Sequence, residues 1–136
     1  MRMVRKTTVV AAMAFWACLM LAAQQPSDMV GTWSGDATLE GMDEPNTLTL
    51  VLEMKEGKLA GHMTDQYEAI DAHITDIVLE QGTFSFSVTV LYGLMYGPDN
   101  QGTAKFKMKV LENIMKGDLE IPEMNAKGAW QATKKK

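Results

Sequence analysis

The sequence predicts an all-β fold, an eight-stranded antiparallel up-and-down β-barrel that follows an N-terminal signal helix. Apolar and polar residues alternate with a period of two after residue 30, which is typical of strands with one buried face. Turn residues separate the alternating segments at regular intervals. A Gly-x-Trp triplet also stands near each end of this region, beginning at Gly31 and at Gly128.

Residues 1–23 have the composition of a secretory signal peptide. Three basic residues lie near the start, and residues 7–23 form an uncharged, mostly apolar run that is shorter than the roughly 20 residues needed to span a membrane. We expect cleavage after Ala23 and a secreted or periplasmic protein. Retention of the segment as an anchor and lipid attachment at Cys18 are the alternatives.

The remaining residues, 24–136, are expected to form one domain. Cys18 is the only cysteine of the 136-residue chain and lies in the signal segment, so the sequence predicts no disulfide and no thiolate site. Cleavage would also remove both arginines and one lysine, which takes the formal net charge from −4 to −7. No nucleic-acid partner is expected, because an acidic domain without arginine lacks the cations that bind phosphates.

The first four strands are expected over 29–40, 46–55, 58–65 and 70–79. The glycine- and acid-rich residues 41–46 end the first strand. In the second strand, four apolar residues from Leu48 to Met54 share one face, while threonine and charged residues occupy the other. The pair Glu56-Gly57 predicts a tight hairpin turn into the third strand.

The last four strands are expected over 83–93, 101–111, 114–121 and 126–133. The pair Gln81-Gly82 predicts the turn that begins this half, and Glu112-Asn113 predicts a second tight turn. Residues 97–100, with the sequence Gly-Pro-Asp-Asn, carry a strong turn signal. Pro122 ends the seventh strand, because proline cannot donate to a strand ladder.

Eight short strands in simple succession would leave an open sheet with two exposed edges, whereas closure into a barrel removes both edges. We therefore expect the first strand to pair with the last. Gly31, Trp33, Gly128 and Trp130 are expected to mark the two sides of this closure. A sandwich of two sheets with two ordinary core tryptophans is the alternative.

These motifs resemble those of the calycins, the superfamily that contains lipocalins, fatty-acid-binding proteins and avidins. Their hallmark is a Gly-x-Trp at the start of the first strand of a meander, which Gly31-Thr32-Trp33 matches. Residues 48–61 and 128–132 are also similar to small secreted bacterial lipocalin-like proteins. The resemblance implies a barrel with a lumen for a small apolar ligand. Lipocalins usually set a last-strand arginine against the first tryptophan, and the nearest substitute here is Lys134.

The expected function is non-enzymatic binding of a small apolar ligand, a lipid or a fatty acid-like molecule, in the barrel lumen. No catalytic residue, cofactor or metal is expected, and His62 and His73 are interpreted as surface histidines. Membrane contact is expected to be transient at most, and no oligomeric state is predicted. The expected ligand contacts are Leu50, Leu52, Met54, Tyr67, Phe84, Phe86, Tyr92, Phe106 and Met108.

The alternative is a barrel that side chains fill outright, as eight-stranded barrels also allow. Such a protein would act as an interaction module through its outer surface or through a loop over residues 91–96. This loop is rich in apolar and aromatic residues and runs from Leu91 to Tyr96.

Overall fold

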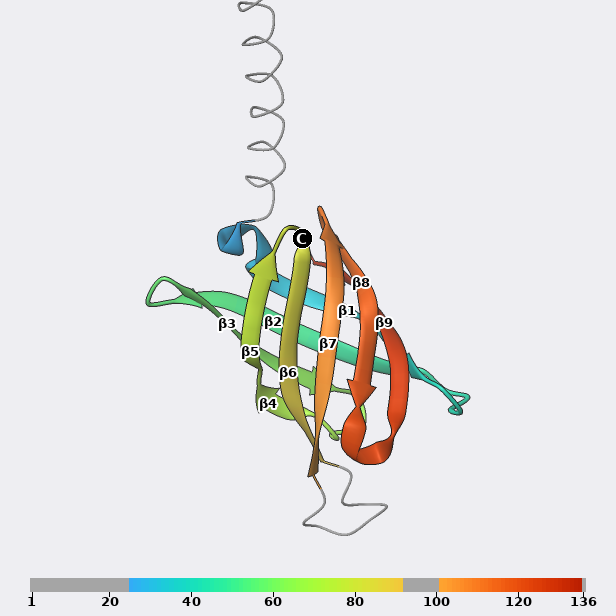
Figure 1. Cartoon of the computed structure of the whole chain (residues 1–136). Coiled ribbons are helices and arrows are strands. Elements are labelled where there is room, and N and C mark those ends of the chain that lie inside the picture. Colours follow the sequence, from blue (N-terminus) through green and yellow to red (C-terminus); the bar gives the residue numbers. More distant parts are fainter. Residues whose placement is uncertain (1–24, 92–100, 136) are drawn as a thin grey trace, which may run out of the picture.

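A computed structural model describes residues 25–91 and 101–135 and places nine strands of this part in one antiparallel sheet (Figure 1). Two short 3-10 helices, η1 (Pro26–Met29) and η2 (Pro122–Met124), lie before the first strand and before the last. The strands are β1 (Gly31–Leu39), β2 (Asn46–Lys55), β3 (Lys58–Asp65), β4 (Asp71–His73), β5 (Thr75–Glu80), β6 (Thr83–Leu91), β7 (Gln101–Leu111), β8 (Ile114–Ile121) and β9 (Ala126–Lys134).

The order of the strands closes the sheet almost completely. β1 pairs with β2 on one side and with β9 on the other, so the first and last strands lie together in the middle of the sheet. The sheet edges are β4 and β5, which follow each other directly in the chain. The sheet therefore curls into a nearly closed barrel (Figure 1). The expected all-β fold and the pairing of the first strand with the last are confirmed, and the single sheet rules out the sandwich.

The strand count corrects our expectation, because the described chain has nine strands rather than eight. The strand expected over 70–79 is divided at Ile74, where the backbone changes partner from β3 to β6. Asp76 adopts a positive φ of 52°, and the register of β5 with β6 shifts in the same region. Ile74 stays buried, and its N–H donates to the carbonyl oxygen of Gly61 at 2.9 Å. The inward side chains are Ile70, Ala72 and Ile74 before the break and Ile77 and Leu79 after it, so the alternation changes phase at Asp76.

The other seven expected strands correspond to β1, β2, β3, β6, β7, β8 and β9. Two of the expected turns adopt the conformation that their sequences predict. Glu56-Gly57 and Gln81-Gly82 have positive φ at both residues, as the type I′ hairpin turn requires. The expected signal helix over residues 1–23 lies outside the described residues, and so does the expected ligand contact Tyr92.

Two buried tryptophans anchor the closure between β1 and β9. Trp33 Nε1 donates to the carbonyl oxygen of Met29, and Trp130 Nε1 donates to that of Gly35, each at 2.9 Å. These bonds satisfy the only polar atom of each indole ring. The two strands also approach closely. A Cβ on Gly35 would collide with the backbone of β9, and a Cβ on Gly128 would collide with the backbone of β1.

Lys134 fastens η1 to the closed barrel. Its Nζ donates to the carbonyl oxygen of Asp28 at 2.7 Å and to that of Val30 at 3.4 Å. The same ammonium group lies 5.5 Å from the ring centroid of Trp33, within the range of a cation–π contact. The lysine stem passes over Gly31, where a Cβ would lie 2.8 Å from Cδ and where φ is +141°. Lys134 thus occupies the position expected for it beside the first tryptophan.

We predict that Lys134→Met lowers the free energy of unfolding by about 1 kcal/mol, because it removes two charge-assisted hydrogen bonds and the cation–π contact but keeps the apolar stem. Urea unfolding followed by tryptophan fluorescence measures the change. Lys135→Met is the matched control, because Lys135 is exposed and its hydrogen bond to Thr32 joins backbone atoms only. Equal stability of the two variants would contradict a stabilising role for Lys134.

Candidate functional site

Side chains fill the half of the barrel that lies next to η1. Leu52 pairs with Gly31, the first residue of β1, close to η1. The interior of the barrel near this pair consists of buried apolar side chains. The boundary of the packed half is aromatic: Phe86 stacks on Phe106 with 4.7 Å between ring centroids, and Phe106 meets the edge of Trp130 at 5.6 Å. The fully buried side chains of this half include Met29, Trp33, Leu50, Leu52, Met63, Phe84, Met108 and Met115.

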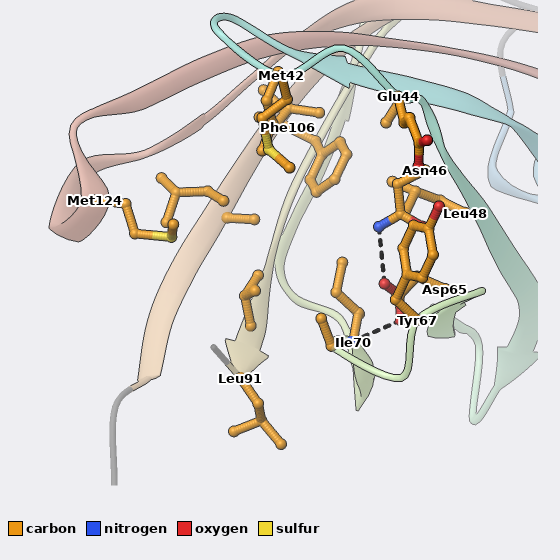
Figure 2. Close-up of a pocket in the computed structure, with 17 residues that line it drawn as sticks. Met42, Glu44, Asn46, Leu48, Asp65, Tyr67, Ile70, Leu91, Phe106 and Met124 are labelled. Atoms are coloured by element: carbon orange, nitrogen blue, oxygen red, sulfur yellow. Dashed lines mark hydrogen bonds between the residues drawn. The ribbon is translucent and has the colours of Figure 1, made fainter. Parts of the chain in front are cut away.

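The opposite half of the barrel contains a pocket of about 350 Å³. It lies among the C-terminal part of β1, the N-terminal part of β2, the segments that follow β1 and β3, the end of β6, and η2. Figure 2 shows Asp65 and Tyr67 on one wall and Met124 on the other, with Phe106 between them. The lining residues are Ala37, Leu39, Met42, Glu44, Asn46, Leu48, Asp65, Tyr67, Ala69, Ile70, Val90, Leu91, Ala104, Phe106, Leu119, Ile121 and Met124.

Asp65 organises the polar part of the pocket wall. Its Oδ2 accepts a hydrogen bond from Asn46 Nδ2 at 2.8 Å, and its Oδ1 accepts one from the backbone N–H of Ile70 at 2.9 Å (Figure 2). An ionised carboxylate only accepts hydrogen bonds, so Asn46 must turn its NH₂ group toward Asp65. Asn46 Oδ1 is then buried without a hydrogen-bond partner among the described residues. The chain after β3 is thereby tied to the start of β2.

The pocket contains only part of the expected contact set. Tyr67 and Phe106 line it. Met54 does not line it and lies near the end of β2 with 40% of its surface exposed. The remaining described members belong to the packed half and are buried away from the pocket: Leu50, Leu52, Phe84, Phe86 and Met108. These five side chains are buried in the core and do not line the pocket, and whether any of them contacts a ligand stays a prediction.

Sequence reasoning missed the lining residues that come from turns and short segments between strands. Met42, Glu44 and Ala69 lie outside the strands, and Met124 lies in η2. Strand alternation carries no information about such positions. Two of them did carry a signal, because methionines in polar turn segments need an apolar surface to cover. Met42 and Met124 could therefore have indicated that the pocket lies at the end of the barrel between their two segments.

His62 and His73 form a pair on the outer face, across β3 and β4. Their ring centroids lie 4.9 Å apart in an edge-on arrangement, and His62 Nε2 lies 2.6 Å from Asp71 Oδ1. Both partners of this contact are substantially exposed. Within the described residues, no group of three or more histidine, cysteine, aspartate or glutamate side chains is arranged to hold a metal ion.

A second hollow, about 480 Å³, lies on the outer surface of β7, β8 and β9. The register places Lys105 opposite Glu120 and Lys107 opposite Asp118, and Glu40 and Lys127 border the same hollow. Charges of both signs therefore alternate across it. Such a surface selects neither anions nor cations strongly, in contrast to the pocket, whose charged lining residues are both acidic.

No protein-family model, no curated protein and no solved structure matches this chain. The nearly closed antiparallel barrel is compatible with a calycin-like fold, and the resemblance to lipocalins rests on the sequence motifs. In the part of the chain that the structure describes, no helix combines the length and apolar character needed to cross a membrane.

Two methionines allow the division of the barrel to be tested. We predict that Met63→Ala, in the packed half, lowers the free energy of unfolding by about 2–5 kcal/mol, because it leaves a cavity among buried neighbours. Met124→Ala, on the pocket wall, should cost less than about 1 kcal/mol, because that side chain already borders open volume. Urea unfolding of both variants measures the difference. Equal losses would mean that the two halves are packed alike.

Proposed function

We propose that this chain binds a small, mostly apolar ligand in the pocket at the open end of the barrel and catalyses no reaction there. The observation that carries the proposal is a cavity of about 350 Å³ with largely apolar walls, set in a barrel whose other half is filled. The proposal includes export, with residues 1–23 removed after Ala23, on the strength of the sequence of that segment.

The energy of binding would come from burial of apolar ligand surface, which stabilises by roughly 25 cal/mol per Å². Paired strands form most of the walls, so little ordering would be needed when the ligand enters. Phe106 offers a ring that Phe86 supports from behind, and this stack would serve as the floor. Tyr67, which is 55% exposed at the rim, offers a hydroxyl group to a polar end of the ligand.

The size of the pocket limits the ligand. At roughly 30 Å³ for each heavy atom, a figure taken from the volume of a water molecule in the liquid, 350 Å³ holds about twelve heavy atoms. A medium-length alkyl chain fits this volume, and a longer ligand would leave one end outside. The pocket lies near the lower limit of the usual range for ligand sites.

An interaction module remains the second candidate function, and exposed apolar side chains favour it. Leu91 is 45% exposed at the rim of the pocket, and Leu111 is 74% exposed on β7 beside the hairpin that leads to β8. Of the proposed contact loop over residues 91–96, only Leu91 lies within the described residues. In this case the pocket would bind no small ligand, and a partner protein would cover these side chains.

We predict that the wild-type protein enhances the fluorescence of N-phenyl-1-naphthylamine, a neutral apolar dye whose ten-carbon naphthyl group fits the pocket and whose phenyl ring would stay outside it. Ala69→Trp should weaken dye binding at least ten-fold. The indole would occupy the pocket that Ala69 lines. Ala60→Trp is the matched control, because Ala60 is similarly half-buried but does not line the pocket. Dye titration measures both affinities. Equal dye binding by the two variants, or failure of the wild type to bind either the dye or a decyl amphiphile, would contradict the proposal and leave the interaction module.

A further inference from the structure

The charged groups of the pocket wall are all acidic. Glu44 and Asp65 line it, and the lining contains no lysine, arginine or histidine among the described residues. After removal of residues 1–23 the chain carries a net charge of −7, so its overall charge reinforces the local one.

The hydrogen-bonding groups of the wall point to the same kind of ligand. In their ionised form, the carboxylates of Asp65 and Glu44 accept hydrogen bonds and cannot donate them. The hydroxyl group of Tyr67 can both accept and donate. Asn46 directs its NH₂ group to Asp65, and its Oδ1 is buried without a partner among the described residues, so Asn46 presents no free donor group that a carboxylate could use in place of a cation. The wall therefore offers mostly acceptors, and it is best satisfied by a head group that donates hydrogen bonds.

A fatty-acid anion fits this wall poorly. Its carboxylate carries the same charge as Glu44 and Asp65, and it can donate no hydrogen bond. Proteins that hold carboxylates usually provide an arginine, a lysine or backbone N–H groups for them. An alkyl ammonium ion has the complementary charge and donates hydrogen bonds, and a fatty alcohol donates one without any charge. Charge and hydrogen bonding thus both predict that the pocket binds the alkyl ammonium ion most tightly, the alcohol less tightly and the fatty-acid anion least tightly.

We propose that the pocket selects single-chain amphiphiles whose head group is an ammonium or a hydroxyl group and discriminates against those with a carboxylate. The proposal rests on the proposed binding function and specifies its ligand class. The alkyl chain lies against Phe106 and its apolar neighbours, and the head group lies at the rim beside Glu44 and Asp65. This preference departs from the fatty acid-like ligand that the resemblance implies.

The test compares three ligands with one chain length that matches the pocket: decylamine, decanol and decanoate. Isothermal titration calorimetry at neutral pH, below micelle-forming concentrations, should show decylamine binding at least ten-fold more tightly than decanoate, with decanol between them. Added salt should narrow the difference, because it screens charges near the rim. Ala69→Trp should abolish decylamine binding, and binding that persists in this variant would mean adsorption outside the pocket and would overturn the proposal.

Reversal of one charge tests the cause of the preference. Glu44→Lys should weaken decylamine binding three-fold or more and tighten decanoate binding by a similar factor. Glu80→Lys is the control, because Glu80 is exposed and does not line the pocket, and this variant should bind all three ligands as the wild type does. Equal effects of Glu44→Lys and Glu80→Lys would show that the net charge of the protein, and not the charge of the pocket wall, determines the order of the three affinities.

The outcomes separate this proposal from the broader one. Equal affinity for the three ligands, or a preference for decanoate, would overturn the ligand class while the binding function stands. Binding of the neutral dye without binding of any decyl compound would also overturn the ligand class. Failure of both the dye and the decyl compounds to bind would overturn the binding function itself.

Discussion

The pairing of β1 with β9 determines the position of every other strand. Without it, β1–β4 and β5–β9 would form two separate meanders with four exposed edges in place of one curled sheet. The pairing requires close approach of two backbones, which explains why Gly35 and Gly128 face the opposite strand without side chains. The indole bonds of Trp33 and Trp130 then hold the junction from inside, and Lys134 holds it from the η1 end. A domain without disulfides depends on contacts of this kind.

The seam opposite this pairing lies between β4 and β5 and is protected in another way. β4 has only three residues, and β5 is irregular where it meets β6. Short and irregular edge strands are poor templates for pairing with another chain. Ile74 lies between them with its side chain in the core, so the seam interrupts the hydrogen bonding of the sheet but not its apolar interior. One buried residue thus allows the barrel to stay nearly closed without a complete ring of strand pairs.

The sequence predicted the faces of the strands but not the depth of each side chain along the barrel. Leu48 and Leu50 lie on the same face of β2, yet Leu48 lines the pocket and Leu50 lies in the packed half. Alternation cannot separate them, because the difference depends on which side chains of other strands reach the same level. The break after Ile74 coincides with a change of partner from β3 to β6, and its sequence signal, a change in the phase of the alternation at Asp76, was missed. The closure was predictable because both of its strands carry a Gly-x-Trp signature.

The barrel is divided into a packed half and a half that contains the pocket. Apolar side chains packed beside η1 provide the burial that the fold needs, and this leaves the other half free to remain open. Two polar residues of the pocket wall, Glu44 and Asn46, come from the connection between β1 and β2 and from the first position of β2. Substitutions there change the charge and hydrogen bonding of the pocket without touching the closure or the core. Under the proposed binding function, the ligand preference would therefore depend on a few residues at one end of the barrel.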